Sequence, residues 1–309
     1  MLENKSISLP KQMNIPAGWR SWAKLGVSLF FLIWIISKIP MGNLKDSLVH
    51  AHKPDLLLAF FMVNLCMLVS VLKWRPLLTV LQIKISLNRL LAFYYVGLFA
   101  NNFLPSSIGG DALRIYDVAR ESGKTSGAVA SVVVERLMAS LALGFTAAVA
   151  IVIVSQQSNA MVYWSVGGII ASCFFLLGII FYYPFQEKGF IGRFLYRLGE
   201  YKKYPSTLAL VLILSFTFQA CLVLVNVFIF KAVGFQLPIY IHLLYIPVIM
   251  AVSMIPLSIN GLGVREGMYV LLYGYAGVDA TTAMLCSLLF FTLVTISSLA
   301  GGVIILFRK

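Results

Sequence analysis

The stretch PSSIGGDALR at residues 105–114 recurs as PLSINGLGVR at residues 256–265, and this pair of sequences decides the expected fold. The two copies align without a gap, share five of ten positions (Pro, Ser, Ile, Gly and Arg), and lie 151 residues apart. Because this offset is close to half of the 309-residue chain, the pattern predicts an internal structural repeat. Pro and Gly are strong helix breakers, so each copy also marks an interruption.

A short apolar run precedes each copy, and a short helix is predicted to follow it. The runs, residues 90–104 and 240–255, are shorter than the about 20 residues that a membrane-spanning helix needs. Short, Pro/Gly-interrupted segments at matching positions of two halves are typical of transporters built from inverted repeats. The sequence therefore predicts two re-entrant or broken helix hairpins.

The composition places the whole chain in a membrane. Hydrophobic residues make up 60% of it and charged residues 11%, whereas soluble domains average roughly 45–50% and about 25%. These values exclude an ordinary soluble enzyme, a disordered chain and a nucleic-acid-binding domain. The fold prediction is an all-α polytopic membrane protein with an inverted-topology repeat, the two hairpins and about six full transmembrane helices. The six predicted spans are residues 25–39, 55–74, 125–155, 160–184, 206–233 and 280–307.

The domain organisation follows from these spans. Residues 1–24 are predicted to be a cytoplasmic N-terminal segment, and residues 25–309 a single integral membrane domain. Its repeat halves are about residues 25–155 and 160–307. Residues 185–205 are basic with apolar residues at helical spacing, which predicts a cytoplasmic amphipathic linker.

The net charge of +13 is explained by topology. With the N-terminus inside, 17 of the 24 Lys and Arg fall in cytoplasmic segments, Lys73 among them, and four fall outside. This bias follows the positive-inside rule and places both termini in the cytoplasm. Three arginines remain at membrane depth: Arg114, Arg136 and Arg265. The basicity therefore requires no nucleic-acid partner.

The two breaks are candidate anion sites. Glycines leave backbone N–H groups free, a helix N-terminus follows, and Arg114 and Arg265 lie one turn inside the helices. Arginine binds phosphate in a bidentate manner. The alternative is that both arginines only reach for a membrane surface. The other candidate substrate-binding residues at the breaks are Asn102, Ser107, Gly109, Gly110, Asp111, Ser258, Asn260, Gly261 and Glu266.

Glu135 and Arg136 add a charged pair to the span at residues 125–155. A charge at the centre of a membrane costs roughly 2.5–3.5 kcal/mol, so both are expected to turn inward and to be paired. Three carboxylates (Asp111, Glu135 and Glu266) then balance the three arginines. Two interpretations stay open: a salt-bridge network that only fixes helix register, or a polar cavity for an anionic or zwitterionic head group. A proton-coupling role for Glu135 or Asp111 also stays open.

Metal and cofactor sites are not predicted. The four cysteines (Cys66, Cys173, Cys221 and Cys286) are isolated in apolar stretches and are interpreted as buried hydrophobic residues. His50 and His52 lack a third ligand nearby in the sequence, which leaves only a weak metal pattern.

The motifs at these positions resemble a known family. The chain is similar to the lysylphosphatidylglycerol synthase transmembrane-domain (flippase-like domain) family at four motifs. These are Asn102-Phe103-Leu104-Pro105; Gly109-Gly110-Asp111 with Arg114; Glu135-Arg136-Leu137; and Ile255-Pro256 followed by Asn260-Gly261-Leu262-Gly263-Val264-Arg265-Glu266-Gly267. The resemblance covers about residues 20–307. It implies a multi-pass protein of a bacterial or archaeal cytoplasmic membrane. In the synthases this domain moves the aminoacylated lipid between leaflets, and a separate soluble domain makes that lipid.

The predicted function is a lipid flippase for an anionic or zwitterionic lipid: an aminoacylated phospholipid, a glycolipid or a polyprenyl phosphate. The sequence given ends two residues after the last predicted span, so the aminoacyltransferase domain is expected to be absent and the chain not to be an enzyme. The alternative is a membrane-embedded enzyme or an accessory subunit acting on a lipid-linked substrate. A small-solute transporter is a third hypothesis. The expected partners are a lipid head group, membrane lipids, and a lipid-modifying synthase or a second copy of this chain.

Overall fold

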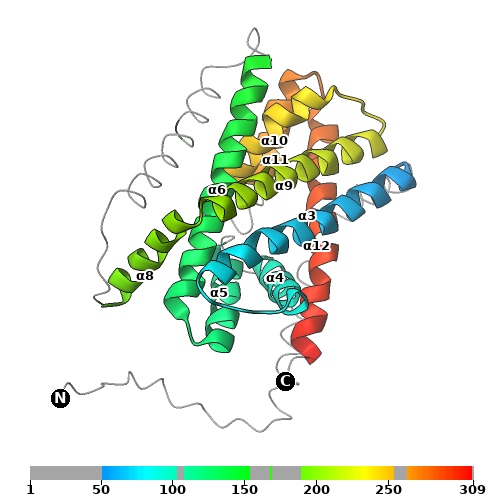
Figure 1. Ribbon diagram of the computed structural model, residues 1–309. Coiled ribbons are helices and arrows are strands. Elements are labelled where there is room, and N and C mark those ends of the chain that lie inside the picture. Colours follow the sequence, from blue (N-terminus) through cyan, green and yellow to red (C-terminus); the bar gives the residue numbers. More distant parts are fainter. Residues whose placement is uncertain (1–50, 103–107, 154–167, 169–188, 254–262, 308–309) are drawn as a thin grey trace, which may run out of the picture.

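The computed structural model describes residues 51–102, 108–153, 168, 189–253 and 263–307 (Figure 1). In these residues the regular secondary structure is entirely helical. The prediction of an all-α fold is therefore confirmed. The predicted N-terminal segment, residues 1–24, lies outside the described residues.

The described helices repeat in a long, short, short, long order. The first set is α3 (Lys53–Val80), α4 (Leu87–Asn101), α5 (Ile108–Ser122) and α6 (Thr125–Ile153). The second set is α9 (Pro205–Ala232), α10 (Ile239–Ser253), α11 (Val264–Tyr275) and α12 (Ala280–Phe307). Since α9 begins 152 residues after α3, and α10 begins 152 residues after α4, the helices repeat at nearly the spacing of the sequence motif.

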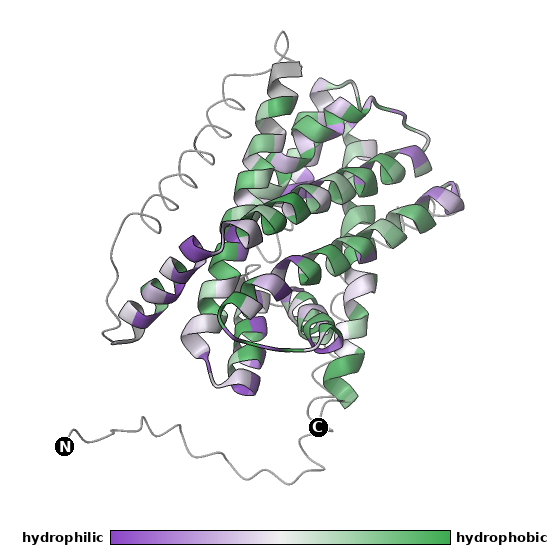
Figure 2. Cartoon of the chain, in the orientation of Figure 1, coloured by the Kyte–Doolittle hydropathy of each residue, from purple (hydrophilic) through white to green (hydrophobic). Residues whose placement is uncertain are grey.

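Four of the described helices are long and apolar enough to cross a membrane: α3, α6, α9 and α12. Figure 2 shows hydrophobic residues along most of their length. They match four of the six predicted spans and confirm a polytopic membrane protein. The other two predicted spans, residues 25–39 and 160–184, lie outside the described residues.

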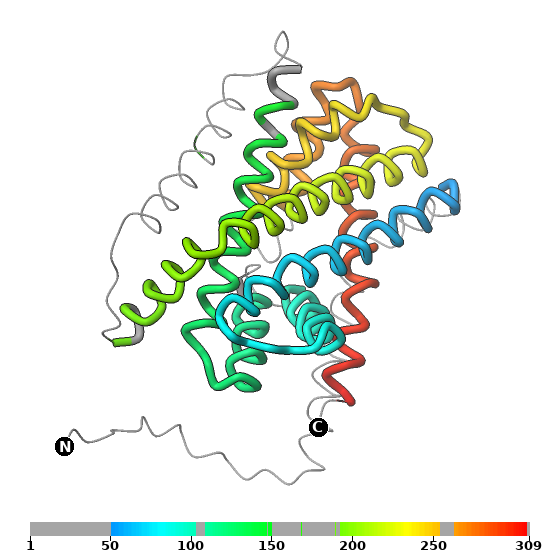
Figure 3. The backbone as a smooth tube through the Cα atoms, viewed as in Figure 1, coloured from blue at the N-terminus to red at the C-terminus, as the bar shows by residue number. Residues whose placement is uncertain are grey.

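Corresponding helices of the two halves run in opposite directions. At one end of the α3–α9 pair, the backbone N–H of His52 donates to the carbonyl of Ala232 at 2.9 Å. At the other end, the hydroxyl of Tyr201 donates to the carbonyl of Leu77 at 3.0 Å. Figure 3 shows the two helices side by side, and shows α6 and α12 pointing in opposite directions. This antiparallel relation is what an inverted-topology repeat requires.

The short helices form two antiparallel hairpins. In the first, Arg89 near the start of α4 pairs with Glu121 near the end of α5, at 2.6 Å. In the second, the ring of Tyr245 in α10 lies 5.3 Å from the ring of Tyr273 near the end of α11. Each hairpin crosses into the other half, because α4 packs on α12 and α10 packs on α6.

Small residues allow α4 and α12 to approach closely. A Cβ atom on Gly301 would overlap the backbone carbonyl of Tyr95, and one on Gly302 would contact the ring of Phe99 at 2.9 Å. Polar side chains fasten the same contact, since the amide of Asn102 donates to the hydroxyl of Ser298 at 2.8 Å. This is the packing typical of membrane helices, in which small residues bring backbones together and buried polar groups bond across helices.

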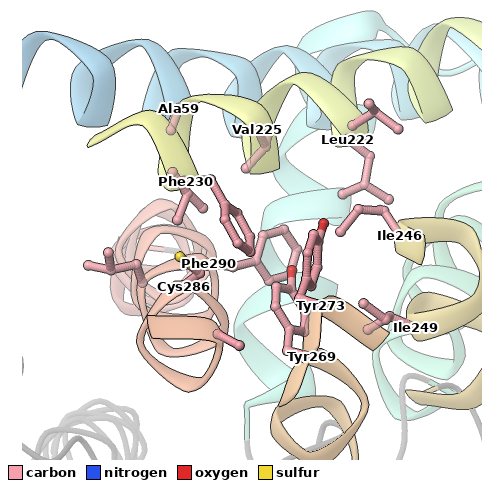
Figure 4. Packing of buried hydrophobic residues seen from close by; sticks show 14 of the residues in the cluster. Ala59, Leu222, Val225, Phe230, Ile246, Ile249, Tyr269, Tyr273, Cys286 and Phe290 are labelled. Atoms are coloured by element: carbon pink, nitrogen blue, oxygen red, sulfur yellow. The ribbon is translucent and has the colours of Figure 1, made fainter. Parts of the chain in front are cut away.

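Aromatic side chains fill the core of the second half. Figure 4 shows Phe230, Tyr269, Tyr273 and Phe290 gathered between α9, α11 and α12. The rings of Phe230 and Tyr273 lie 4.3 Å apart, and the hydroxyl of Tyr269 bonds to the buried amide of Asn226. Apolar and aromatic contacts thereby hold the hairpin α10–α11 against α9 and α12, and the Tyr269 hydroxyl among them is paired with Asn226.

The predicted linker contains α8 (Gly189–Glu200) and a turn of 3₁₀ helix, η1 (Tyr201–Lys203). Arg193 is exposed, whereas Leu198 is buried at 4% exposure against the first half. The part of the predicted linker from residue 189 onward is therefore an amphipathic helix, as its pattern indicated. Its position on the cytoplasmic surface stays a prediction.

Candidate functional site: a charged cavity between the two hairpins

A cavity of about 280 Å³ lies where the two halves meet. Arg114 from α5 and Arg265 from α11, the two arginines of the repeated motif, both line it. Three other predicted site residues, Gly110, Asp111 and Arg136, line it as well. Although the two arginines are 151 residues apart in the chain, the repeat brings both side chains to the wall of one cavity.

Arg114 is the centre of an ion-pair cluster in the first half. Its guanidinium is 2.5 Å from the carboxylate of Asp111 and 3.2 Å from that of Glu135. Arg136 lies 2.6 Å from the second oxygen of Asp111. The arginine side chains differ in burial, because that of Arg114 is 3% exposed and that of Arg136 is 38% exposed.

Lys73 is a further member of this cluster that the sequence analysis missed. The prediction ended the second span at Trp74 and assigned Lys73 to a cytoplasmic loop, which is wrong. In the structure α3 continues through Pro76 to Val80 and buries Lys73, whose ammonium lies 3.4 Å from Glu135. Leu77 and Leu78, the apolar residues that follow Lys73 and Arg75, were the signal that the helix continues.

The lysine changes the charge balance that the sequence predicted. Around the cavity there are four cationic side chains (Lys73, Arg114, Arg136 and Arg265) against three carboxylates (Asp111, Glu135 and Glu266). The predicted balance of three against three is therefore corrected to four against three. One more positive than negative charge at membrane depth favours an anionic ligand, since buried charges are costly unless they are paired.

Aromatic rings hold the Arg114 guanidinium in place. Its central carbon lies 4.2 Å from the ring of Tyr94 and 4.9 Å from that of Trp74. The indole of Trp74 is anchored in turn, because it donates to the hydroxyl of Ser131 in α6 at 3.0 Å. Such cation–π contacts strengthen when water is excluded and fix the plane of the guanidinium.

The second half surrounds Arg265 with a simpler set of groups. The guanidinium lies 2.9 Å from Glu266 and donates to the hydroxyl of Ser287 at 3.3 Å. Glu266 also accepts from the backbone N–H of Gly263, a residue with φ of 84° that begins α11. Only glycine adopts this backbone conformation readily. Glu266 therefore both caps the helix and pairs with the arginine.

The crossing of α4 and α5 positions Arg114 at the cavity. A Cβ atom on Gly97 or Gly110 would overlap the backbone carbonyl of the other residue. The backbone N–H of Gly110 donates to Asn101 Oδ1 at 2.7 Å, and Asn101 lines the cavity. Gly110 therefore allows the two backbones to approach closely, and its N–H, which the sequence predicted to be free for an anion, is bonded to Asn101. Its role in substrate binding stays a prediction.

Gln219 in α9 is a polar side chain that lines the cavity and was not predicted. It is 4% exposed, and its Oε1 has no hydrogen-bond partner among the residues that the structure describes. A buried acceptor without a partner is costly, by about 1–3 kcal/mol. Its position facing the same space as the arginines makes it a candidate contact for a ligand.

The remaining predicted site residues lie elsewhere. Asn102 bonds to Ser298 at the α4–α12 contact and is not among the residues that line the cavity. Glu135 and Glu266 stand behind the arginines, and half-buried Gly109 lies beside Gly110 without lining the space. Four predicted residues lie outside the described residues: Ser107, Ser258, Asn260 and Gly261.

Within the described part of the chain, no group of three His, Cys, Asp or Glu side chains is placed to hold a metal ion. The described cysteines, Cys66, Cys221 and Cys286, are buried and free.

Comparison with known proteins gives two matches. The family model described as the lysylphosphatidylglycerol synthase TM region matches residues 21–302. A UPF0104 membrane protein of Methanocaldococcus jannaschii is 26% identical over 121 residues, which cover 38% of this chain and 36% of that relative. The alignment thus spans little more than a third of the curated relative. The family match covers both halves of the repeat and every cavity-lining arginine.

Proposed function

Because this chain belongs to the lysylphosphatidylglycerol synthase transmembrane-region family, we propose that it moves an anionic or zwitterionic lipid between the leaflets of a cell membrane. The observation that carries the proposal is that Arg114 and Arg265, one from each half, line the same cavity. Inverted-repeat transporters bind their substrates at the interface of the two halves. The arrangement therefore supports a single substrate site shared by both repeats.

The chemistry of the cavity suits a phosphate-containing head group. Guanidinium groups bind phosphate oxygens in a bidentate manner, and the charged residues that line the cavity are three arginines and one carboxylate, that of Asp111. With a volume of about 280 Å³, the space accommodates a head group rather than an entire lipid. The candidate substrates remain an aminoacylated phospholipid, a glycolipid or a polyprenyl phosphate.

The proposed topology follows from the predicted charge bias. We place both termini and α8 on the cytoplasmic side, and treat the hairpins α4–α5 and α10–α11 as re-entrant from opposite sides. In this arrangement the two hairpins reach the cavity from opposite sides of the membrane, as alternating access requires.

A role as a transporter rather than an enzyme is favoured by how the carboxylates are engaged. Asp111 contacts two arginines, and Glu135 contacts Lys73 and Arg114. A carboxylate that bridges two cations holds those side chains in place, which is a positioning role rather than proton transfer to a substrate. We therefore propose that these groups position the arginines, and that the chain is not itself an enzyme.

Reconstitution into liposomes tests this function. Purified protein in vesicles containing a fluorescent phosphatidylglycerol is expected to expose label from both leaflets to an impermeant quencher, whereas empty vesicles expose only the outer half. The double variant Arg114→Met/Arg265→Met is expected to behave like empty vesicles. A wild-type protein that moves none of the three candidate lipid classes would contradict the proposal. A new lipid product seen by mass spectrometry would favour the enzyme alternative, and activity only with a co-purified synthase would favour an accessory subunit.

Replacing Gln219 with leucine is expected to slow translocation about tenfold without lowering stability. The leucine removes an acceptor that has no protein partner among the described residues, so the folded state loses no internal hydrogen bond to Oε1. A ligand donor would lose its acceptor, which costs about 1–1.5 kcal/mol. Vesicle translocation rates and thermal unfolding in detergent measure the two effects. Unchanged translocation would remove Gln219 from the site.

A further inference from the structure

A second hollow adjoins the central cavity on the outside of the α5–α6 pair. This groove has a volume of about 320 Å³. Five apolar residues form most of its wall: Ala112, Ile115, Val132, Val133 and Leu137. They come from consecutive turns of two packed helices, so the groove runs along the seam between them.

The groove and the cavity share three wall residues: Asp111, Ser140 and Arg136. The ion pair between Asp111 and Arg136 therefore stands between a cavity that three arginines line and a groove whose wall is mostly apolar. Arg136 is also the most exposed arginine of the cluster, with a side chain 38% exposed against 3% for Arg114. A cavity with charged side chains in its wall that adjoins an apolar groove at an ion pair matches the two chemically different ends of a lipid.

We propose that the α5–α6 groove is the lateral entrance for the lipid, and that it holds the first segment of a hydrocarbon chain while the head group occupies the cavity. This inference rests on the proposed function. A lipid whose phosphate lies at Arg114 needs an apolar surface for its hydrocarbon chain next to the cavity, and the groove provides one that begins at the wall residues the two spaces share. Hydrocarbon that stays against apolar residues avoids the unfavourable transfer into a charged space.

The Asp111–Arg136 pair acts as the boundary of this entrance. An arriving phosphate can replace one carboxylate oxygen on Arg136, and Asp111 keeps its second contact to Arg114 during the exchange. No charge is then left without a partner. The ion pair can therefore open without the free-energy penalty of leaving a buried charge unpaired.

Filling the groove tests the inference. Ala112 is an exposed residue of the groove wall, and Ala112→Trp is expected to reduce translocation of a long-chain fluorescent phosphatidylglycerol at least tenfold. Binding of the soluble head group glycerophosphoglycerol, measured by calorimetry in detergent, is expected to stay within about twofold of wild type, because the cavity itself is not filled. The matched control is Ala209→Trp, at an exposed position of α9 that does not line the groove, with unchanged translocation.

The outcomes separate this inference from the proposed function. A wild-type protein that moves no lipid contradicts the proposed function, whatever the variant does. An active wild type together with a fully active Ala112→Trp overturns the groove alone. Loss of both translocation and head-group binding in Ala112→Trp also overturns it, since the substitution would then act on the cavity. If Ala112→Trp does not fold, Ile115→Trp fills the same groove from one turn further along α5 and is judged by the same results.

Discussion

Replacing Arg114 with methionine is expected to slow lipid translocation at least tenfold while the protein stays folded. Without Arg114, two ion pairs remain, Lys73 with Glu135 and Arg136 with Asp111, and each cation keeps one carboxylate. Methionine retains apolar volume between the rings of the neighbouring aromatic residues. The substrate loses a charge-assisted contact worth about 1.5–3 kcal/mol, which corresponds to a loss of roughly tenfold to more than a hundredfold.

The matched variant Glu135→Ala is expected to lose stability, whereas Arg114→Met is expected to lose translocation and to stay folded. It leaves Lys73 without its carboxylate and Arg114 with only Asp111. Removing one member of a buried pair costs about 3–5 kcal/mol, so the folded yield should fall sharply. Detergent-solubilised protein is compared by size-exclusion chromatography and thermal unfolding, and translocation is measured in vesicles.

The contrast between these two variants decides between the two interpretations of the charge cluster. Folded Arg114→Met with slowed translocation, beside unstable Glu135→Ala, assigns the arginine to the substrate. Equal losses of stability in both variants would mean that the cluster only fixes the helices. Full activity of Arg114→Met would remove this arginine from the site.

Gly301→Leu is expected to prevent formation of the native fold. Even the first carbon of a side chain at Gly301 would overlap the carbonyl of Tyr95, and this obstacle is backbone that cannot rotate away. Leucine would force α12 off α4 and break the buried bond between Asn102 and Ser298. We expect a loss of several kcal/mol, at the upper end of what overpacking costs, about 1–3 kcal/mol or more.

The control is Gly274→Ala in α11, where an added Cβ would meet nothing within 4 Å. Alanine there should preserve or raise stability, because it favours the helix over glycine by about 1 kcal/mol. Monodisperse protein after size-exclusion chromatography is the measurement. A Gly301→Leu variant that remains monodisperse and unfolds at the wild-type temperature would show that the α4–α12 contact is not needed for the fold.

The helices could be located from the sequence because their signals are local. A run of apolar residues long enough to cross a membrane predicts a span wherever it folds, and Pro and Gly mark a break by their own backbone chemistry. For this reason the described spans α3, α6, α9 and α12 and the amphipathic α8 lie where the pattern placed them. The prediction for Lys73 is wrong because the charges of Lys73 and Arg75 suggest the end of a span, whereas the helix continues to Val80.

Composition, the lengths of the apolar runs and the repeated motif are enough to predict an all-helical membrane protein with three arginines at membrane depth. They do not predict which charges meet, because ion pairs between distant residues depend on how the helices pack. Lys73 in α3 contacts Glu135 in α6, 62 residues further along the chain, because these two helices pack together. Arg114 and Arg265, 151 residues apart, line one cavity because each short-helix hairpin packs against a long helix of the other half. Helix packing also places Gln219 in the cavity wall and forms the α5–α6 groove, and neither can be inferred from adjacent residues in the chain.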